Sequence, residues 1–269
     1  MDNRPIGVFD SGLGGLTSVK ELMRRLPQES IVYFGDTGRV PYGTRSDETI
    51  TKYVFQDIRF LLNFDIKLII IACGTASSVA LEKVQQAFNI PIIGVVYPAA
   101  SQAVNISTTG KIGIIGTPGT INSGSYIRII KELAPDAKTF SKACPLFVPL
   151  VENGYTMNEV ARLVAQEYLG PLKDKCVDTL IMGCTHYPLL KNTIEGIMGK
   201  EVRLIDPGAE TAKYVKQLLI DKNMLGQSGI VPTYKYFVSD CIENFSRLGS
   251  LFLEKEITQS VEKIDIEKY

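Results

Sequence analysis

Residues 68–77 read LIIIACGTAS, and residues 179–188 read TLIMGCTHYP. Each stretch begins as an apolar run typical of a buried strand and ends in a small or polar turn that holds a cysteine, Cys73 or Cys184. Similar apolar runs alternate with longer segments of helical period along the whole chain. This alternation is typical of βα units, so the sequence predicts an α/β fold with mainly parallel central sheets flanked by helices.

The two halves of the chain repeat the same order of motifs. The segment 6–9 (IGVF) with its glycine-rich turn corresponds to the segment 112–115 (IGII) with its own turn. After a similar length of chain, each is followed by one of the two cysteine turns. We therefore expect two pseudo-symmetric α/β domains. The alternative is a coincidence of strand and turn patterns, which any α/β protein can produce.

Between these motifs the pattern predicts a strand at 90–96 and then the next strand at 111–115. One helix is expected to run from the turn after that strand to residue 133, where Pro135 follows shortly. A further strand is expected near 146–150, leading into a loop at 151–154.

The overall composition is that of an ordinary globular protein with no charge bias. The chain has 269 residues, with 29 basic and 29 acidic side chains. This balance gives no electrostatic reason to expect a nucleic acid or an anionic membrane as partner. The longest apolar run is too short to cross a bilayer, and residues 1–5 lack the apolar core of a signal peptide. We therefore expect a cytoplasmic protein.

The cysteine and histidine content argues against disulfides and metals. Five cysteines without a secretion signal do not suggest a disulfide framework. With His186 as the single histidine and no C-x-x-C pair, no zinc site is expected. The glycine run at 12–15 lacks the spacing of a nucleotide-binding loop, and nothing resembles a pyridoxal lysine site, so no cofactor is expected.

The two strand-end cysteines carry the functional prediction. In open α/β sheets functional side chains gather at the carboxyl ends of the strands, where Cys73 and Cys184 both stand. Backbone N–H groups and the dipole of a following helix favour thiolate over thiol there. Two equivalent thiols facing one cleft suit the transfer of a proton from one face of a carbon to the other. A nucleophilic hydrolase would instead need one cysteine and a base.

Four motifs, in this order, resemble the glutamate racemases of the aspartate/glutamate racemase superfamily. They are residues 10–15 (DSGLGG), 35–43 (GDTGRVPYG), 72–77 (ACGTAS) and 183–189 (GCTHYPL). The resemblance continues past residues 206–208. It implies a cofactor-independent enzyme that interconverts L- and D-glutamate and supplies D-glutamate for peptidoglycan. Glutamate would be its small-molecule partner, and the resemblance leaves a homodimer open.

The resemblance also implies a domain division and a set of catalytic residues. Residues 1–97 together with 208–269 would form the first domain and residues 98–207 the second, with the active site in the cleft between them. Cys73 would deprotonate D-glutamate, and Cys184 would deprotonate L-glutamate. The polar groups that assist the thiols would be Asp10, Asp36, Glu152 and His186. We expect Asp10 to support Cys73 and His186 to support Cys184.

The expected substrate-binding residues lie in the same motifs. They are Asp10, Ser11, Pro41, Tyr42, Gly43, Gly74, Thr75, Thr117, Thr120, Thr185 and His186. The phenol of Tyr42, the backbone N–H groups of its loop and the turn at 117–120 are expected to hold the distal carboxylate. The family commonly has Asn at the position of Gly74, so the backbone, Thr75 or a water must substitute for that side chain here.

Some of these residues also have ordinary structural explanations. Asp10 and Asp36 are equally typical of turns rich in glycine, and Glu152 taken alone would be a solvated surface residue. Two other functions stay open beside glutamate racemisation. One is a racemase of aspartate or another acidic substrate, and the other is a small-ligand-binding module without turnover, which would have no need of matched thiols.

Overall fold

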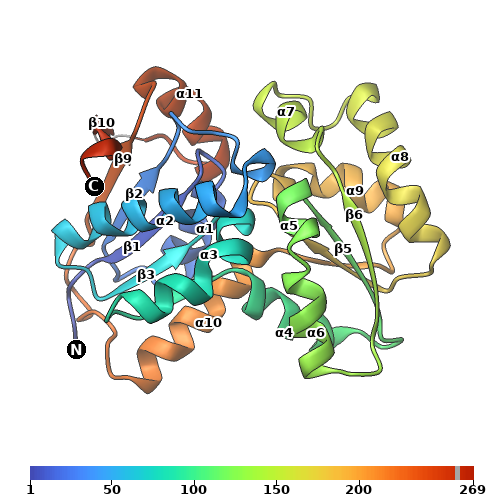
Figure 1. Ribbon diagram of the computed structural model, residues 1–269, viewed down its shortest axis with the longest axis horizontal. Coiled ribbons are helices and arrows are strands. Elements are labelled where there is room, and N and C mark those ends of the chain that lie inside the picture. Colours follow the sequence, from blue (N-terminus) through green and yellow to red (C-terminus); the bar gives the residue numbers. More distant parts are fainter. Residues whose placement is uncertain (258–260) are drawn as a thin grey trace.

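The computed structural model describes residues 1–257 and 261–269, which form two parallel β-sheets with helices packed around them. The strand order is β10-β9-β2-β1-β3-β4 in the first sheet and β6-β5-β7-β8 in the second. All strand pairs within both sheets are parallel. Figure 1 shows the sheets in two lobes, one holding both chain termini. The predicted fold class is confirmed.

The strands are β1 (Ile6–Asp10), β2 (Ile31–Gly35), β3 (Leu68–Ile71), β4 (Ile92–Gly94), β5 (Lys111–Gly116), β6 (Lys138–Ala143), β7 (Thr179–Met182), β8 (Arg203–Ile205), β9 (Tyr234–Val238) and β10 (Val261–Lys263). The α-helices are α1 (Leu16–Arg25), α2 (Asp47–Leu61), α3 (Gly74–Ala87), α4 (Val96–Ile106), α5 (Pro118–Asn122), α6 (Ser125–Leu133), α7 (Phe147–Glu152), α8 (Glu159–Asp174), α9 (Lys191–Met198), α10 (Pro207–Asp221) and α11 (Ile242–Leu253). Short 3₁₀ turns include η1 (Tyr42–Thr44), η3 (Tyr187–Leu190) and η4 (Ile266–Lys268).

The two sheets share one topology. The order β2-β1-β3-β4 in the first corresponds to β6-β5-β7-β8 in the second. Cys73 stands two residues beyond the end of β3, and Cys184 stands two residues beyond the end of β7, its counterpart. The repeat in the sequence therefore corresponds to a repeat of strand order, and it places both cysteines at carboxyl edges.

The C-terminal part of the chain returns to the first sheet. Strand β9 pairs in parallel with β2, and β10 pairs with β9. Helix α10 packs against α1 of the same lobe and against α4, which leads into the second sheet. The division at residues 97 and 207 stays a prediction, because helices α4 and α10 themselves connect the lobes.

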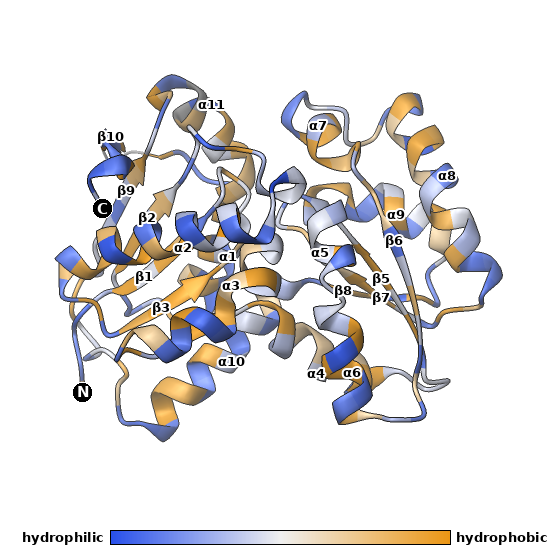
Figure 2. Ribbon diagram, in the orientation of Figure 1, coloured by the Kyte–Doolittle hydropathy of each residue, from blue (hydrophilic) through white to orange (hydrophobic). Residues whose placement is uncertain are grey.

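The core of each lobe comes from the apolar strands and one face of each amphipathic helix. Figure 2 shows apolar residues concentrated in β1, β3, β5 and β7. All four residues of β3 and all four of β7 are buried. This burial excludes water from both sides of the central strands, as expected for parallel sheets covered by helices. No helix among the described residues is long and apolar enough to span a membrane.

The prediction of a strand near 146–150 is wrong. The strand of this region is β6, and residues 147–152 form helix α7. Edge strand β6 is largely polar and partly exposed, so it lacks the apolar run that marks a buried strand. Helix α7 buries Phe147 and Val151, which lie one turn apart on its inner face.

Two other predicted elements also differ from those in the structure. The strand expected at 90–96 is only three residues long, and α4 intervenes before β5. The single helix expected up to residue 133 is divided into α5 and α6. Gly124 lies between them with φ +66°, a left-handed conformation that glycine adopts without strain.

Candidate active site

A cavity of about 390 Å³ opens at the carboxyl edges of both sheets. Residues of both lobes line it, including the two cysteines. Of the residues predicted from the sequence, the cavity lining contains Ser11, Pro41, Tyr42, Gly43, Cys73, Gly74, Thr75, Thr117, Glu152, Cys184, Thr185 and His186. Asp10, Asp36 and Thr120 lie outside this lining. The repeat thus brings two thiols to one cavity from opposite sheets.

Cys73 is the N-cap residue of α3. The N–H of Ala76 donates to its sulfur at 3.5 Å, and the thiol donates to Ser11 Oγ at 3.5 Å. Burial, followed by the negative charge of Asp10, raises the pKa of Cys73 to about 12. At neutral pH the free protein therefore holds Cys73 as a thiol, which is the form that donates a proton.

Asp10 ends strand β1 and is almost fully buried. Its Oδ1 accepts from Gly12 N–H at 2.9 Å, and its Oδ2 accepts from the Thr185 hydroxyl at 3.4 Å. Burial raises its pKa, and the nearby His186 and the backbone N–H donors oppose that shift. Asp10 is thus both a turn residue and a link between the lobes, placed to act on Cys73 through its charge.

Cys184 faces a histidine and a carboxylate. His186 Nδ1 lies 3.9 Å from Cys184 Sγ, and Nε2 lies 3.0 Å from Glu152 Oε1. Burial alone would lower the pKa of His186, but its interactions with Cys184 and Glu152 raise it to about 10. The imidazole is therefore protonated at neutral pH and places a positive charge beside the Cys184 sulfur.

The helix dipole expected beside both thiols is present only at Cys73. Cys184 is followed by the 3₁₀ turn η3, and α9 begins later, at Lys191. His186 supplies the positive charge at this thiol instead. The two halves thus share topology but support their cysteines by different groups.

Phe252 of α11 is a contact of His186 that the sequence did not indicate. Its ring meets the imidazole edge to face, with centroids 5.2 Å apart and an interplanar angle of 83°. Phe252 is buried. No local signal could identify it, because it comes from the C-terminal part of the chain.

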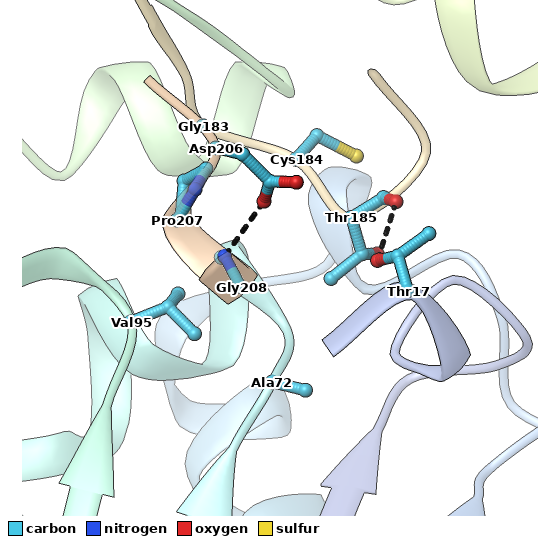
Figure 3. Close-up of a pocket in the computed structure, with 10 residues that line it drawn as sticks. Thr17, Ala72, Val95, Gly183, Cys184, Thr185, Asp206, Pro207 and Gly208 are labelled. Carbon is cyan, nitrogen blue, oxygen red and sulfur yellow. Dashed lines mark hydrogen bonds between the residues drawn. The ribbon is translucent and has the colours of Figure 1, made fainter. Parts of the chain in front are cut away.

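The glycine run after β1 serves close packing between the lobes. A Cβ on Gly14 would lie 2.2 Å from Thr185 Oγ1 and 2.6 Å from His186 Nδ1. The Thr17 hydroxyl donates to the Thr185 carbonyl at 3.1 Å, across the same contact (Figure 3). A side chain at Gly14 would therefore displace the histidine that supports Cys184.

A second cavity beside Cys184, of about 10 Å³, is shown in Figure 3. Asp206 lies in its lining and caps α10, accepting from Gly208 N–H at 2.9 Å. Burial raises the pKa of Asp206. In the sequence, Asp206 belongs to the segment up to which the family resemblance extends, and no role is predicted for it.

Three hydroxyl groups lie together beside the large cavity. Thr75 Oγ1 is 2.8 Å from Thr117 Oγ1, and Thr120 Oγ1 is 3.1 Å from Thr117 and 3.3 Å from Thr75. Thr75 and Thr117 line the cavity, whereas Thr120 is buried behind them. This cluster offers hydrogen-bond donors to a carboxylate.

The expectation that the Tyr42 phenol faces a substrate is wrong. Its hydroxyl makes a short hydrogen bond to Asp36 and lies 3.1 Å from Asp57 Oδ2, so the phenol points away from the cavity. Asp36 is fully buried in an ion pair with Arg39 and does not line the cavity. A direct catalytic role for Asp36 does not fit this geometry. Backbone N–H groups of the loop can still face a ligand.

Gly74 brings the two cysteine turns into contact. A Cβ at this position would lie 2.4 Å from the Gly183 carbonyl oxygen and 3.6 Å from Thr120 Oγ1. The space that a larger residue would fill is therefore occupied by the backbone of the opposite lobe.

This arrangement is suited to acid–base chemistry on both faces of one carbon. One thiol is protonated, the other stands beside an imidazolium, and both face the same cavity. Within the described residues no group of three or more His, Cys, Asp or Glu side chains is arranged to hold a metal ion.

Comparisons with known proteins agree with this chemistry. The family model described as Asp/Glu/Hydantoin racemase matches residues 10–215. A glutamate racemase of Geobacter metallireducens is 49% identical over 93% of each chain. The crystal structure of glutamate racemase isoform RacE1 from Bacillus anthracis superposes with a TM-score of 0.95, at 39% identity over 98% of each chain. That of the Francisella tularensis glutamate racemase in complex with D-glutamate has a TM-score of 0.93, at 42% identity over the whole of both chains. With its sequence matched across most of its length and its fold shared throughout, the chain belongs to the Asp/Glu/Hydantoin racemase family.

Proposed function

We propose that this protein is a glutamate racemase that interconverts L- and D-glutamate by proton transfer between two thiols, without a cofactor. The observation that carries the proposal is the placement of Cys73 and Cys184 at equivalent strand ends on one cavity. Its substrate is taken from relatives that are named glutamate racemases, one of them solved with D-glutamate. Supply of D-glutamate for peptidoglycan is the corresponding role in the cell.

In the L-to-D direction Cys184 acts as the base. Its thiolate, stabilised by the His186 imidazolium, takes the α-proton of L-glutamate, and the electron pair stays on the α-carbon and its carboxylate. The thiol of Cys73 then gives its proton to the opposite face. The reaction leaves Cys184 protonated and Cys73 as thiolate.

In the D-to-L direction the roles are exchanged, so Cys73 must first lose its proton and Cys184 must gain one, which the adjacent His186 imidazolium can supply. Asp10 is the group that would hold the Cys73 proton, because burial already raises its pKa and its charge acts on Cys73. Glu152 would assist through His186. These are the roles that the resemblance implies, and the geometry and charge of the site support them.

The Thr75 and Thr117 hydroxyls, which Thr120 contacts from behind, and the backbone N–H groups of Tyr42 and Gly43 would hold the distal carboxylate. Aspartate is one methylene shorter and would not reach these donors while its α-carbon lies between the thiols. Ser11, Gly74, Thr185 and His186 line the α-carbon end of the cavity. The homodimer and the cytoplasmic location stay predictions.

The test is racemisation of L-glutamate in deuterated water at low conversion. Two fixed thiols deliver a hydrogen isotope from solvent to the product. D-glutamate should therefore carry deuterium at the α-carbon, while recovered L-glutamate should keep protium there. Cys73→Ala and Cys184→Ala should each abolish racemisation, because each direction needs both groups.

Four outcomes would contradict the proposal. Protium in the early product would indicate one base that swings between faces. A single alanine variant with near-native activity would remove that cysteine from the mechanism. Equal turnover of L-aspartate in the same assay would favour a broader acidic substrate class, and binding without turnover would favour a ligand-binding module.

A further inference from the structure

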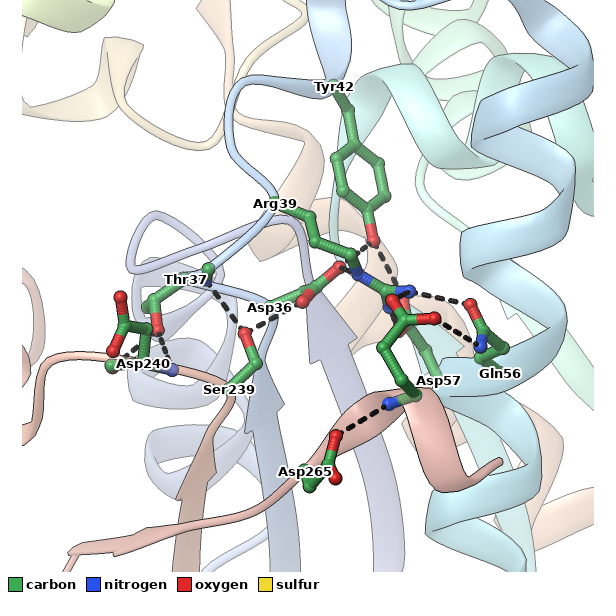
Figure 4. Close-up of polar contacts among 11 residues, drawn as sticks. Asp36, Thr37, Arg39, Tyr42, Gln56, Asp57, Ser239, Asp240 and Asp265 are labelled. Atoms are coloured by element: carbon green, nitrogen blue, oxygen red, sulfur yellow. Dashed lines mark hydrogen bonds and ion pairs between the residues drawn. The ribbon is translucent and has the colours of Figure 1, made fainter.

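A buried polar cluster lies behind the loop that lines the distal end of the cavity (Figure 4). We call it the Arg39 cluster, and its members are Asp36, Arg39, Tyr42, Gln56, Asp57, Ser239 and Glu267. Arg39 Nε donates to Asp36 Oδ2 at 2.6 Å, and Nη2 donates to Asp57 Oδ1 at 3.0 Å. The cluster joins β2, α2, the end of β9 and η4 around one guanidinium.

The remaining contacts leave few free hydrogen-bonding positions. Arg39 Nη1 donates to Gln56 Oε1 at 2.6 Å and to Glu267 Oε1 at 3.3 Å. The guanidinium lies over the ring of Tyr53, with its carbon 4.1 Å from the ring centroid. Ser239 Oγ donates to the second oxygen of Asp36 at 2.8 Å.

The proton count of this cluster does not balance if both aspartates are ionised. Asp36 and Asp57 are fully buried, and one guanidinium faces them, while Glu267 lies at the exposed rim. The Tyr42 hydroxyl lies between one oxygen of Asp36 and one oxygen of Asp57. A phenol has one proton, so it can donate to only one of these oxygens. The other oxygen must carry a proton of its own to make a hydrogen bond.

We infer that Asp57 carries this proton and donates it to Tyr42 Oη, and that Asp57 and Arg39 are positioning residues that fix the loop 40–44 for the distal carboxylate of the substrate. Tyr42 then donates to the ionised Asp36, and one carboxylate balances one guanidinium. The inference rests on the proposed function, whose substrate it concerns.

The electrostatic surroundings of Asp57 agree with this assignment. Burial, and next the charge of Asp36, raise its pKa well above its ordinary value, and Arg39 opposes them only in part. The other ionisable groups that act on it are Tyr42 and, farther away, Asp10.

The loop 40–44 connects the Arg39 cluster to the cavity. Val40, Pro41, Tyr42, Gly43 and Thr44 all line it. Gly43 packs against the second lobe, because a Cβ there would lie 2.8 Å from Thr117 Cβ. Thr117 belongs to the hydroxyl cluster. Movement of the loop would therefore separate the donors on the two sides of the distal carboxylate.

The test compares three variants of the cluster with the wild-type protein. In Asp57→Asn the amide can donate to Tyr42 and accept from Arg39, so it reproduces the protonated carboxyl, and KM for both enantiomers should stay within about twofold of wild type. Asp57→Ala removes both contacts and should raise KM about tenfold while kcat changes much less, as expected when binding shared by the ground state and the transition state is lost. Tyr42→Phe keeps the backbone and ring but loses the bridging hydroxyl, and KM should rise in the same sense.

A matched control is the buried ion pair of Lys67 with Glu29, whose Nζ and Oε2 are 2.5 Å apart. Lys67 is fully buried near the amino ends of the strands, where it also binds the carbonyls of Asp2 and Met224. Lys67→Met should lower Tm without changing KM, which separates general destabilisation from loop positioning.

The outcomes distinguish this inference from the proposed function. Wild-type protein that neither racemises glutamate nor binds D-glutamate by calorimetry would overturn the proposed function. With an active wild type, an unchanged KM in Asp57→Ala, or in Tyr42→Phe where the alanine variant does not fold, would overturn the positioning role. Asp57→Asn that loses affinity like the alanine variant would overturn the proton assignment.

Discussion

His186 joins the second thiol to a carboxylate and has no counterpart at the first thiol. Its Nδ1 lies beside Cys184 and its Nε2 beside Glu152, in a pocket closed by the Phe252 ring. We predict that His186→Asn lowers kcat in the L-to-D direction by about 100-fold, because asparagine carries no charge to stabilise the Cys184 thiolate. The D-to-L direction should lose less kcat.

The two enantiomers have equal free energy in water, so kcat/KM must fall by one factor in both directions. The ratio of KM for L-glutamate to KM for D-glutamate must therefore fall by the same factor as the ratio of the two kcat values, which is measurable by following each direction with chiral analysis. Glu152→Gln should show the same asymmetry more weakly. Equal kcat losses in both directions would mean that His186 serves the cavity as a whole.

At the scale of elements, the sequence predicted best where a strand is central. The runs that form β1, β3, β5 and β7 are largely apolar because both faces of each strand are covered. Edge strand β6 and the three-residue β10 have no such pattern, so one was misplaced and the other was not predicted. The pattern at helix α7 predicts a strand because its six residues, rich in β-branched and apolar side chains, are too few to show a helical period.

Asp178 shows how a side chain stabilises the connection between α4 and β5. Its carboxylate accepts from the Ser107 hydroxyl at 2.7 Å and from the N–H groups of Thr108 and Thr109 at 2.8 and 2.7 Å. Burial would raise its pKa, but these hydrogen bonds outweigh it and hold the pKa well below the ordinary range.

A lowered pKa stabilises the folded state at pH values above the unfolded pKa, and this contribution is lost as the pH falls through the folded one. We predict that Asp178→Asn lowers the free energy of unfolding by about 1–2 kcal/mol at pH 7. The difference from wild type should shrink below about pH 4, near the unfolded pKa of aspartate. Urea unfolding at pH 7 and pH 3 would measure it, with the exposed Asp136→Asn as control. A difference independent of pH would assign the loss to packing.

At the scale of the whole molecule, the sequence indicated the two thiols and could not indicate what surrounds them. Cys73 and Cys184 follow apolar strands in a repeated motif, which is a local signal. Arg39 meets Glu267, and His186 meets Phe252, only because the chain returns to the first lobe. Contacts between such distant parts leave no period or spacing in either segment. The orientation of Tyr42 has a more local cause, since its hydroxyl bonds to Asp36 of the same loop and to Asp57 of α2.

The contact between the two cysteine turns determines how closely the lobes approach. Gly74 lies against the carbonyl of Gly183, and an added Cβ would be 2.4 Å from that oxygen. The obstacle is backbone, which cannot rotate away as a side chain can. The lobes would have to separate, or the turn carrying Cys184 would have to shift. Proton transfer between fixed groups is sensitive to such displacements, where an error of about 1 Å can cost about 100-fold in rate.

We therefore predict that Gly74→Ala lowers kcat/KM about 10- to 100-fold in both directions, with each lobe still folded. Gly196→Ala is the matched control, because Gly196 lies within α9 and a Cβ added there would meet no group within 4 Å outside its own helix turn. That change should leave activity unaltered and raise stability by about 0.5–1 kcal/mol, as alanine favours a helix over glycine. Chiral assays and thermal unfolding of both variants would measure these effects. If Gly74→Ala kept full activity, the lobes could separate without loss of activity. The close approach of the two turns would then not determine the distance between the two thiols.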